Sequence, residues 1–275
     1  MINQVGVTTL CYPEREYGKL KRALEGIAGA GYKNVGITSI GGFGEHLMPE
    51  KQSEAEIAAV NDWLAEYGLT CTCIVGPHCL NSPNGVDTFK RRIDLAVAIG
   101  TTLVEGGTFW PFNGRSPYRE HEWREATELY YYRLGRASEY AASKGVRIAI
   151  ETHTGLTHTG EQCLPLLERV DTDVVGIVYD TGNILHRNKD HKPEEDILHV
   201  ADHLFSIHLK DFSSDEDNRR PGIGEGDVNF PGVFDQLKKK GFSGPMNLEG
   251  VGGPTAEESD AKLKASYEYL SSVLK

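Results

Sequence analysis

Cysteine, basic residues and long apolar runs are scarce in this sequence of 275 residues, and each shortage argues against a class of protein. Five cysteines, an odd number without regular spacing, do not indicate a disulfide framework. Lys and Arg total 29 against 40 Asp and Glu, a formal net charge of −11, so the basic footprint of a nucleic-acid-binding protein is missing. No stretch approaches the roughly 20 apolar residues of a membrane-spanning helix.

The first residues of the sequence, Met1–Thr9, lack a basic segment followed by a long apolar one. We therefore expect no signal peptide, no membrane association and a cytoplasmic location. Cys71 and Cys73 lie two residues apart in an apolar run, and we expect both to be small buried hydrophobic residues on one face of a strand. Whether the chain forms a homo-oligomer is left open.

Strand-like and helix-like segments alternate along the whole sequence. Glycine follows several helix-like segments, at Gly31, Gly68, Gly145 and Gly241, as expected of left-handed helix caps. Eight such units within about 250 residues are typical of a (β/α)8 barrel, so we predict an α/β fold, a single TIM-barrel domain over residues 1–275. The expected strands are Gln4–Leu10, Lys33–Thr38, Thr70–Val75, Thr101–Glu105, Val146–Glu151, Val175–Asp180, Leu204–His208 and Pro245–Glu249. The expected helices are Glu14–Ala30, Glu54–Tyr67, Val86–Ala98, His121–Lys144, Gly160–Val170, Pro193–Ala201, Pro231–Lys240 and Ala256–Val273.

Acidic or imidazole side chains end four successive predicted strands. These residues are Glu151, Asp180, His208 and Glu249. Oxygen and nitrogen donors of this kind suit a hard or borderline divalent metal. The carboxyl ends of the strands are also where a parallel β/α barrel carries its active site. The pattern therefore predicts a metalloenzyme.

Side-chain alternation predicts where these four donors point, because residues two apart in a strand share a face. The residues that share the donors' faces are mostly small or polar, and those on the opposite faces are large and apolar. We expect the first set to line the barrel interior and the second to pack against the outer helices. The first set is Arg147, Ala149, Gly176, Val178, Leu204, Ser206 and Asn247, and the second is Ile148, Ile150, Ile177, Tyr179, Phe205, Ile207, Met246 and Leu248.

Each donor taken singly has a structural explanation. Asp180 before Thr-Gly could shape a turn, and a lone histidine such as His208 is more often a hydrogen-bonded structural residue than a ligand. Three converging carboxylates, however, repel one another unless a cation compensates them. We therefore predict a bound divalent metal ion, with Mn²⁺ preferred and Mg²⁺, Co²⁺ or Zn²⁺ as alternatives.

At these residues the chain resembles the xylose-isomerase-like barrel family, which includes ketose 3-epimerases, sugar isomerases, inosose dehydratases and, more distantly, endonuclease IV. The resemblance implies that Glu151, Asp180, His208 and Glu249 are the metal ligands. It also implies that Glu151 and Glu249 are the two catalytic acid/base groups, able to remove a proton from one face of a carbon next to a carbonyl and to return it to the other. The matching segments are AIETH (Ala149–His153), VYDTGN (Val178–Asn183), SIHLKD (Ser206–Asp211), GIGEGDVNFPGVF (Gly222–Phe234) and MNLEG (Met246–Gly250).

The chain departs from the family three residues after the aspartate, where a histidine that contacts substrate is common. Asn183 stands there, and the nearest histidine is His186, so either side chain is a candidate for substrate binding. Arg219 lies in the loop after the seventh strand, where arginine in this family often binds substrate, although it could equally balance neighbouring acidic residues. Softer candidates to line the pocket are Glu105, His78 and Trp110.

The leading functional hypothesis is a metal-dependent sugar isomerase or epimerase, similar to ketose 3-epimerases, acting on a small-molecule carbohydrate through a metal-stabilised enediolate. The second is a metal-dependent lyase or dehydratase acting on a keto-inositol or a 3-keto sugar, which Asn183 in place of histidine keeps open. An endonuclease IV-like nuclease is disfavoured by the acidic balance and by missing histidines. A sugar-binding barrel without catalysis is the remaining alternative.

Overall fold

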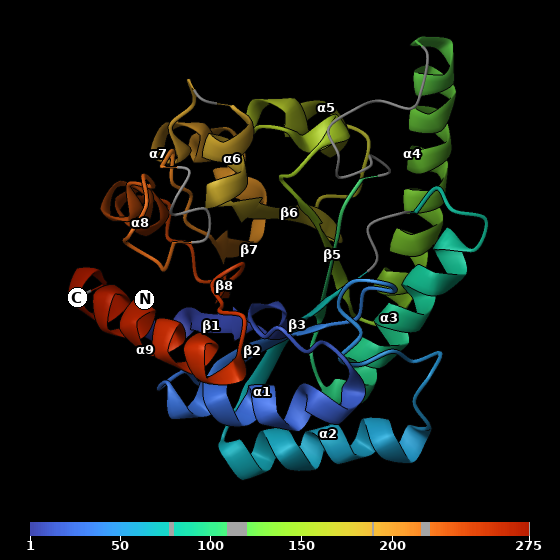
Figure 1. Ribbon diagram of the computed structural model, residues 1–275. Helices are drawn as coiled ribbons and strands as arrows, with labels where there is room; N and C mark the ends of the chain where they lie inside the picture. Colours follow the sequence, from blue (N-terminus) through green and yellow to red (C-terminus); the bar gives the residue numbers. More distant parts are fainter. Residues whose placement is uncertain (77–79, 109–119, 189, 216–220, 275) are drawn as a thin grey trace.

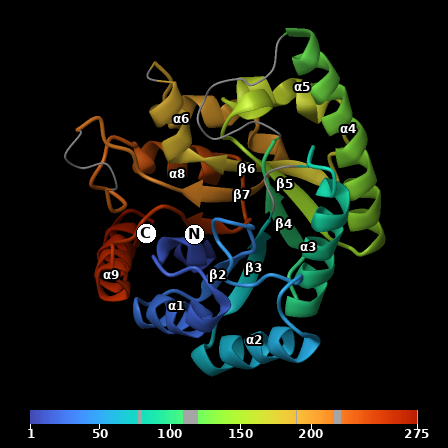
Figure 2. The ribbon, with the colours of Figure 1, turned by 45° about the vertical axis from the view of Figure 1, so that its right-hand side comes forward.

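The computed structural model describes residues 1–76, 80–108, 120–188, 190–215 and 221–274, and these form a closed barrel of eight parallel strands (Figures 1 and 2). Each strand pairs with the next, and β8 pairs with β1, so the ring has no free edge. The predicted TIM-barrel fold is therefore confirmed. The strands are β1 (Val5–Thr8), β2 (Asn34–Thr38), β3 (Thr70–Val75), β4 (Leu103–Gly106), β5 (Arg147–Glu151), β6 (Val175–Asp180), β7 (Leu204–Leu209) and β8 (Met246–Leu248).

Helices surround the barrel and connect its strands (Figure 1). Local sequence explains their ends: Ser53 and Thr255 each form a capping box, with Glu56 and Glu258. At the other end of α2, Gly68 adopts the left-handed conformation (φ 63°) that was expected of it. The helices are α1 (Tyr17–Gly29), α2 (Glu54–Tyr67), α3 (Gly85–Ile99), α4 (Glu120–Ser143), α5 (Leu164–Leu167), α6 (Thr181–Arg187), α7 (Pro193–Asp196), α8 (Phe230–Lys239) and α9 (Ala256–Val273). No helix within the described ranges combines the length and the apolar character that crossing a membrane would need.

The connection after β6 differs from the sequence prediction, which placed its helix at Pro193–Ala201. In the structure α6 begins immediately after the strand, and α7 with a following 3-10 turn accounts for the predicted region. Asp180 explains the early start, because its carboxylate accepts a hydrogen bond from the Asn183 N–H and so caps α6. The same side chain is thus both a helix cap and a predicted metal ligand.

The apolar core has two layers. A large outer layer fills the space between strands and helices, and a small inner cluster lies inside the barrel, with Cys73, Ala149 and Val178 among its members. The predicted faces of Leu204 and Phe205 are wrong: Phe205 belongs to the inner cluster, and Leu204 packs against the outer layer. A register shift between β6 and β7 at this point is the physical reason, since a bulge breaks the two-residue alternation.

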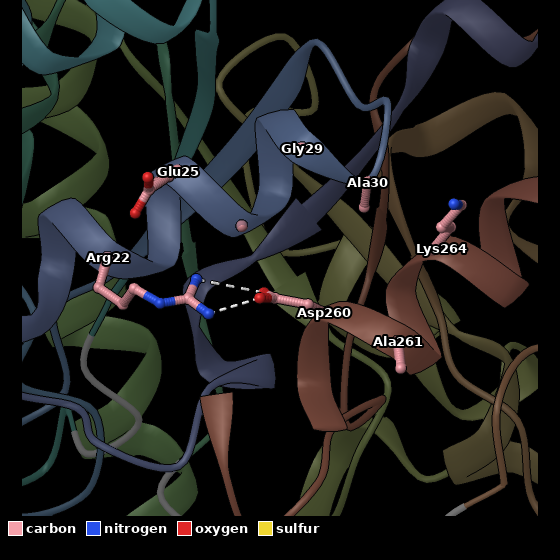
Figure 3. A pocket seen from close by; sticks show the side chains of 8 residues that line it. Arg22, Glu25, Gly29, Ala30, Asp260, Ala261 and Lys264 are labelled. Carbon is pink, nitrogen blue, oxygen red and sulfur yellow. Dashed lines mark hydrogen bonds and ion pairs between the residues drawn. The ribbon is translucent and has the colours of Figure 1, made fainter. Parts of the chain in front are cut away.

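The first and last helices lie side by side and hold the ring closed (Figures 1 and 2). Arg22 of α1 forms an ion pair with Asp260 of α9, which also accepts a 2.6 Å hydrogen bond from Tyr12 (Figure 3 shows the ion pair). A β-carbon at Gly26 would lie 2.0 Å from the Tyr12 hydroxyl, so this close approach requires glycine. A groove of about 600 Å³ runs between the two helices, with Lys264 at its wall.

Candidate metal centre

Four donors meet at the carboxyl ends of the last four strands. Glu151, Asp180 and His208 lie at or near the ends of β5, β6 and β7, and Glu249 directly follows β8. All four are buried, none being more than 6% exposed, and one ligand atom of each lies within 4.8 Å of the others. The predicted inward convergence is therefore present, and the arrangement could hold one divalent cation.

The imidazole of His208 is oriented from beneath. Its Nε2–H donates a 2.9 Å hydrogen bond to Glu105, whose other oxygen accepts 2.6 Å from the Ser206 hydroxyl. Nδ1 is buried and makes no hydrogen bond, and its nearest carboxylate oxygens, on Glu151 and Glu249, lie 3.5 and 3.7 Å away. A buried polar atom without a partner is costly, and a metal ion is a partner that fits an imidazole held by a carboxylate behind it.

Glu105 was predicted as a pocket-lining residue at the end of the fourth strand. It is 1% exposed and lies inside the barrel, with both oxygens accepting hydrogen bonds. This geometry gives it a positioning function for His208.

Lys210 brings a positive charge to the cluster and was missed by the sequence analysis. Its ammonium donates hydrogen bonds to Asp180 (3.3 Å), Glu249 (3.2 Å) and the side-chain oxygen of Asn183 (3.2 Å). The side chain follows His208 by two residues and is 30% exposed, so it comes from the rim of the barrel. The one available signal was the spacing in His-Leu-Lys, which places both side chains on the same face of an extended segment.

Burial and neighbouring charges shift the pKa values of the cluster in opposite directions. Burial raises the pKa of Asp180 to about 7, with the Lys210 charge opposing this and Glu249 adding to it. The pKa of Glu249 is lowered, because His208 and Lys210 together outweigh its own burial. The pKa of His208 is raised well above its usual value, because Glu249 and Glu105 outweigh the effect of burial. The neighbouring carboxylates therefore favour the positively charged form of His208 when no metal is bound.

Asn183, the residue at the family's histidine position, is buried within the site. Its amide nitrogen donates to Glu151 (3.2 Å) and to the Thr152 carbonyl (3.1 Å). Its amide oxygen accepts from Lys210. Asn183 therefore links one predicted acid/base glutamate to Lys210, which in turn contacts the other, Glu249.

Asp211 organises the glycine-rich segment after β7, a second feature that the sequence analysis missed. Its carboxylate accepts four backbone N–H hydrogen bonds of 2.9–3.1 Å. A β-carbon at Gly226 would lie 2.4 Å from this carboxylate. Glycine at position 226 therefore allows the backbone to approach the carboxylate of Asp211 closely. The four donors are Phe212, Gly224, Gly226 and Val228.

Of the other residues predicted to contact substrate, His186 lies within the described part of the chain and three do not. His186 is an exposed residue near the end of α6, and its ring packs against Phe212 with centroids 5.2 Å apart. His78, Trp110 and Arg219 lie outside the described residues. Their predicted contacts with substrate stay predictions.

Comparisons with known proteins agree with this fold. The family model for the xylose isomerase-like TIM barrel matches residues 25–273. An inosose dehydratase of Lactiplantibacillus plantarum is 23% identical over 280 aligned positions, covering 91% of this chain and 87% of that protein. An L-ribulose 3-epimerase of Methylomonas sp. is 23% identical, with 88% and 81% covered.

Solved structures give the same architecture. A D-allulose 3-epimerase from Methylomonas sp. superposes with a TM-score of 0.77 at 21% identity, covering 98% of this chain and 97% of that one. A xylose isomerase-like TIM barrel protein from Mycobacterium smegmatis, solved in complex with magnesium, has a TM-score of 0.75 at 19% identity over 99% and 98%.

Proposed function

Since the chain belongs to the xylose isomerase-like TIM barrel family, we propose that it is a divalent-metal-dependent sugar isomerase or epimerase, similar to ketose 3-epimerases. The observation that carries the proposal is the buried cluster in which Glu151 and Glu249 converge on the unpaired Nδ1 of His208. Two carboxylates at one cation site can serve both as ligands and as a pair of proton acceptor and donor.

In this proposal Glu151, Asp180, His208 and Glu249 hold the metal. A bound divalent cation supplies positive charge that stabilises the oxygen anion developing when a proton leaves the carbon next to a carbonyl. We propose Mn²⁺ as the natural ion, with Mg²⁺, Co²⁺ and Zn²⁺ as alternatives, because three carboxylates and one imidazole suit borderline cations.

Neighbouring side chains orient three of the proposed metal ligands. Asn183 holds Glu151 and Lys210 holds Glu249, so each proposed acid/base carboxylate is oriented by a neighbour of its own. Glu105 holds His208 in the tautomer that leaves Nδ1 available as a ligand. Burial of all four donors excludes bulk water, which strengthens every charge interaction in the site.

The second candidate is a lyase or dehydratase acting on a keto-inositol or 3-keto sugar, a reaction that needs a proton donor for the departing hydroxyl. Lys210 favours it through its charge: the ammonium beside Glu249 and Asn183 can stabilise the oxygen anion of a departing hydroxyl group, while the neighbouring carboxylates raise its pKa and make it a weak proton donor. The similarity to an inosose dehydratase supports the same candidate. Within the described residues one group of metal-ligand type was found, so a nuclease with several metals gains no support.

The test is incubation of the Mn²⁺-loaded protein in D2O with D-fructose, D-tagatose, L-ribulose and a keto-inositol. An epimerase gives deuterium at the carbon next to the carbonyl together with the epimer, and a dehydratase gives a product lighter by water. Chelation and Glu249→Gln should each abolish turnover, and the exposed Glu128→Gln should not. Turnover that survives complete metal removal would refute the proposal. A cytoplasmic location and contacts of His186 or Arg219 with substrate stay predictions, and the oligomeric state stays open.

A further inference from the structure

Arg187, the last residue of α6, is a half-buried arginine without a carboxylate partner among the described residues. Its Nη2 lies 3.3 Å from Nε2 of His153, and its Nε is buried without a hydrogen bond. A guanidinium carries five N–H donors, so this one contact leaves most of its capacity unused.

The contact with His153 orients Arg187 without neutralising it. Since the guanidinium can only donate, Nε2 of His153 must accept, and the ring is the neutral tautomer with its proton on Nδ1. That Nδ1 lies 3.1 Å from the Thr154 hydroxyl, which is placed to accept the proton's hydrogen bond. Arg187 is therefore held in position with its positive charge intact.

Two other arginines of this chain that are shielded from water are each paired with a carboxylate. Arg92, 1% exposed, forms an ion pair with Glu50, and Arg22 pairs with Asp260. Desolvating an arginine is expensive, and these two are compensated by a carboxylate of the chain itself. Arg187 is half-buried and has no such carboxylate partner among the described residues.

The negative charges that act on Arg187 come from the metal cluster. Burial lowers the pKa of Arg187, and the opposing effects come from Glu151 and Asp180. A divalent cation bound to those carboxylates would offset their charge. The neighbouring His158 and His186 cannot supply the missing negative charge, because an imidazole is neutral or cationic; burial and the Arg187 charge lower the pKa of both. With metal bound, the described residues would leave the Arg187 guanidinium without a negative counter-charge.

The position of Arg187 suits the far end of a small substrate. α6 (Thr181–Arg187) begins directly after Asp180, and its seven residues span about 10 Å. His153 follows Glu151 by two residues, so Arg187 approaches the same rim of the barrel from the neighbouring connection. Because the charges of Glu151 and Asp180 act on Arg187, the guanidinium lies close enough to the metal donors for a six-carbon ketose bound there by its carbonyl end to reach it.

We propose that Arg187 binds a carboxylate or phosphate on the end of the substrate remote from its carbonyl. The substrate class is then an anionic ketose, a ketouronate or a ketose phosphate, and a neutral sugar is the poorer ligand. This inference rests on the proposed function, because it assumes that a ketose carbonyl lies at the metal donors. A bidentate guanidinium suits either anion.

The test measures binding to the Mn²⁺-loaded full chain by calorimetry, using matched ligands. One set is D-fructose, D-fructuronate and D-fructose 6-phosphate, and another is D-tagatose with D-tagaturonate. The wild type should bind at least one anion about tenfold or more tightly than its neutral partner, since a charge-assisted hydrogen bond is worth about that much. The preferred anion, carboxylate or phosphate, identifies the source of the charge.

Arg187→Gln should remove the preference for the anionic ligand and leave the affinity for the neutral ketose within about twofold of the wild type. Arg187→Lys should retain part of the preference for the anion. Arg136→Gln, an exposed arginine on α4, is the matched control, and unchanged Mn²⁺ affinity reports an intact site. The proposal is overturned if neither anion binds more tightly than the neutral ketose in the wild type, or if the preference survives in Arg187→Gln. Deuterium exchange measured on the same samples tests the proposed reaction separately from anion binding. Tighter binding of an anion without deuterium exchange would refute the proposed reaction and leave the role of Arg187 intact.

Discussion

The Nε2–H of His208 donates a 2.9 Å hydrogen bond to Oε2 of Glu105, a residue 103 positions earlier in the chain. This contact joins β7 to β4 across the barrel interior and leaves Nδ1 facing Glu151 and Glu249. A carboxylate behind a ligating imidazole fixes its tautomer and raises its basicity. The pair therefore suggests that metal affinity is set partly by a residue that does not touch the ion.

Glu105→Gln should weaken Mn²⁺ binding by about 10- to 100-fold, because the amide removes the negative charge that supports His208. Calorimetric titration with Mn²⁺ measures the change. Glu128→Gln, an exposed residue on α4, is the matched control and should bind as the wild type does. Equal affinity of Glu105→Gln and wild type would show that the contact is only structural.

Metal binding should release protons and become tighter as the pH rises. The pKa of His208 is well above its usual value and that of Asp180 is about 7, so in the metal-free protein at pH 6 both groups carry protons. A ligand must lose its proton to bind, and affinity therefore increases as the pH approaches and passes these pKa values. Calorimetry in buffers of different ionisation enthalpy counts the protons that are released. If no proton is released at pH 6, His208 and Asp180 are not protonated groups that become metal ligands.

Lys210→Met should tighten Mn²⁺ binding and destabilise the metal-free protein. The ammonium contacts Asp180 and Glu249 directly, so it competes with a cation for the same oxygens and compensates them when no cation is present. Each charge-assisted hydrogen bond is worth about 1.5–3 kcal/mol, and the expected gain in metal affinity is about tenfold or more. The gap in Tm between loaded and metal-free protein should widen. The exposed Lys192→Met is the control, and a narrower gap would count against competition.

Gly26→Ala should destabilise the fold even though alanine is the better helix former. The new β-carbon would lie 2.0 Å from the Tyr12 hydroxyl and 2.1 Å from Asp260, so the contact between α1 and α9 has to open. Overpacking of this kind costs about 1–3 kcal/mol. Gly18→Ala, in the same helix with nothing within 4 Å of the new atom, should be neutral or stabilising by up to about 1 kcal/mol. Urea unfolding compares the two variants, and equal stabilities would contradict the packing argument.

The barrel could be predicted because its strands are short apolar runs separated by amphipathic helices and glycine caps. Val175–Asp180 and Thr70–Val75 were predicted to the residue, and each ends where a polar residue or a glycine follows. Phe205 shows the limit of this approach. A β-bulge depends on how two strands pair, and neither strand alone carries that information. That the whole chain is one domain stays a prediction.

The four donors could be predicted because each lies within one residue of the carboxyl end of its strand. Lys210 and Asp211 could not, because a lysine and an aspartate in a loop are ordinarily solvated. Their roles depend on residues distant in sequence: Asp180 and Glu249 for Lys210, and the backbone of 222–228 for Asp211. The short helix α6 was missed because Asp-Thr-Gly reads as a turn, yet Asp180 caps a helix there.

The closure of β8 onto β1 has a consequence for how the protein is made. A ribosome delivers the donors in the order Glu151, Asp180, His208 and Glu249, and the last follows the strand that completes the ring. A nascent chain that has emerged only as far as β7 therefore holds three donors on an open sheet with two unpaired edges. Metal capture and ring closure should thus coincide, so that cation supply during synthesis influences how much of the protein reaches its native state.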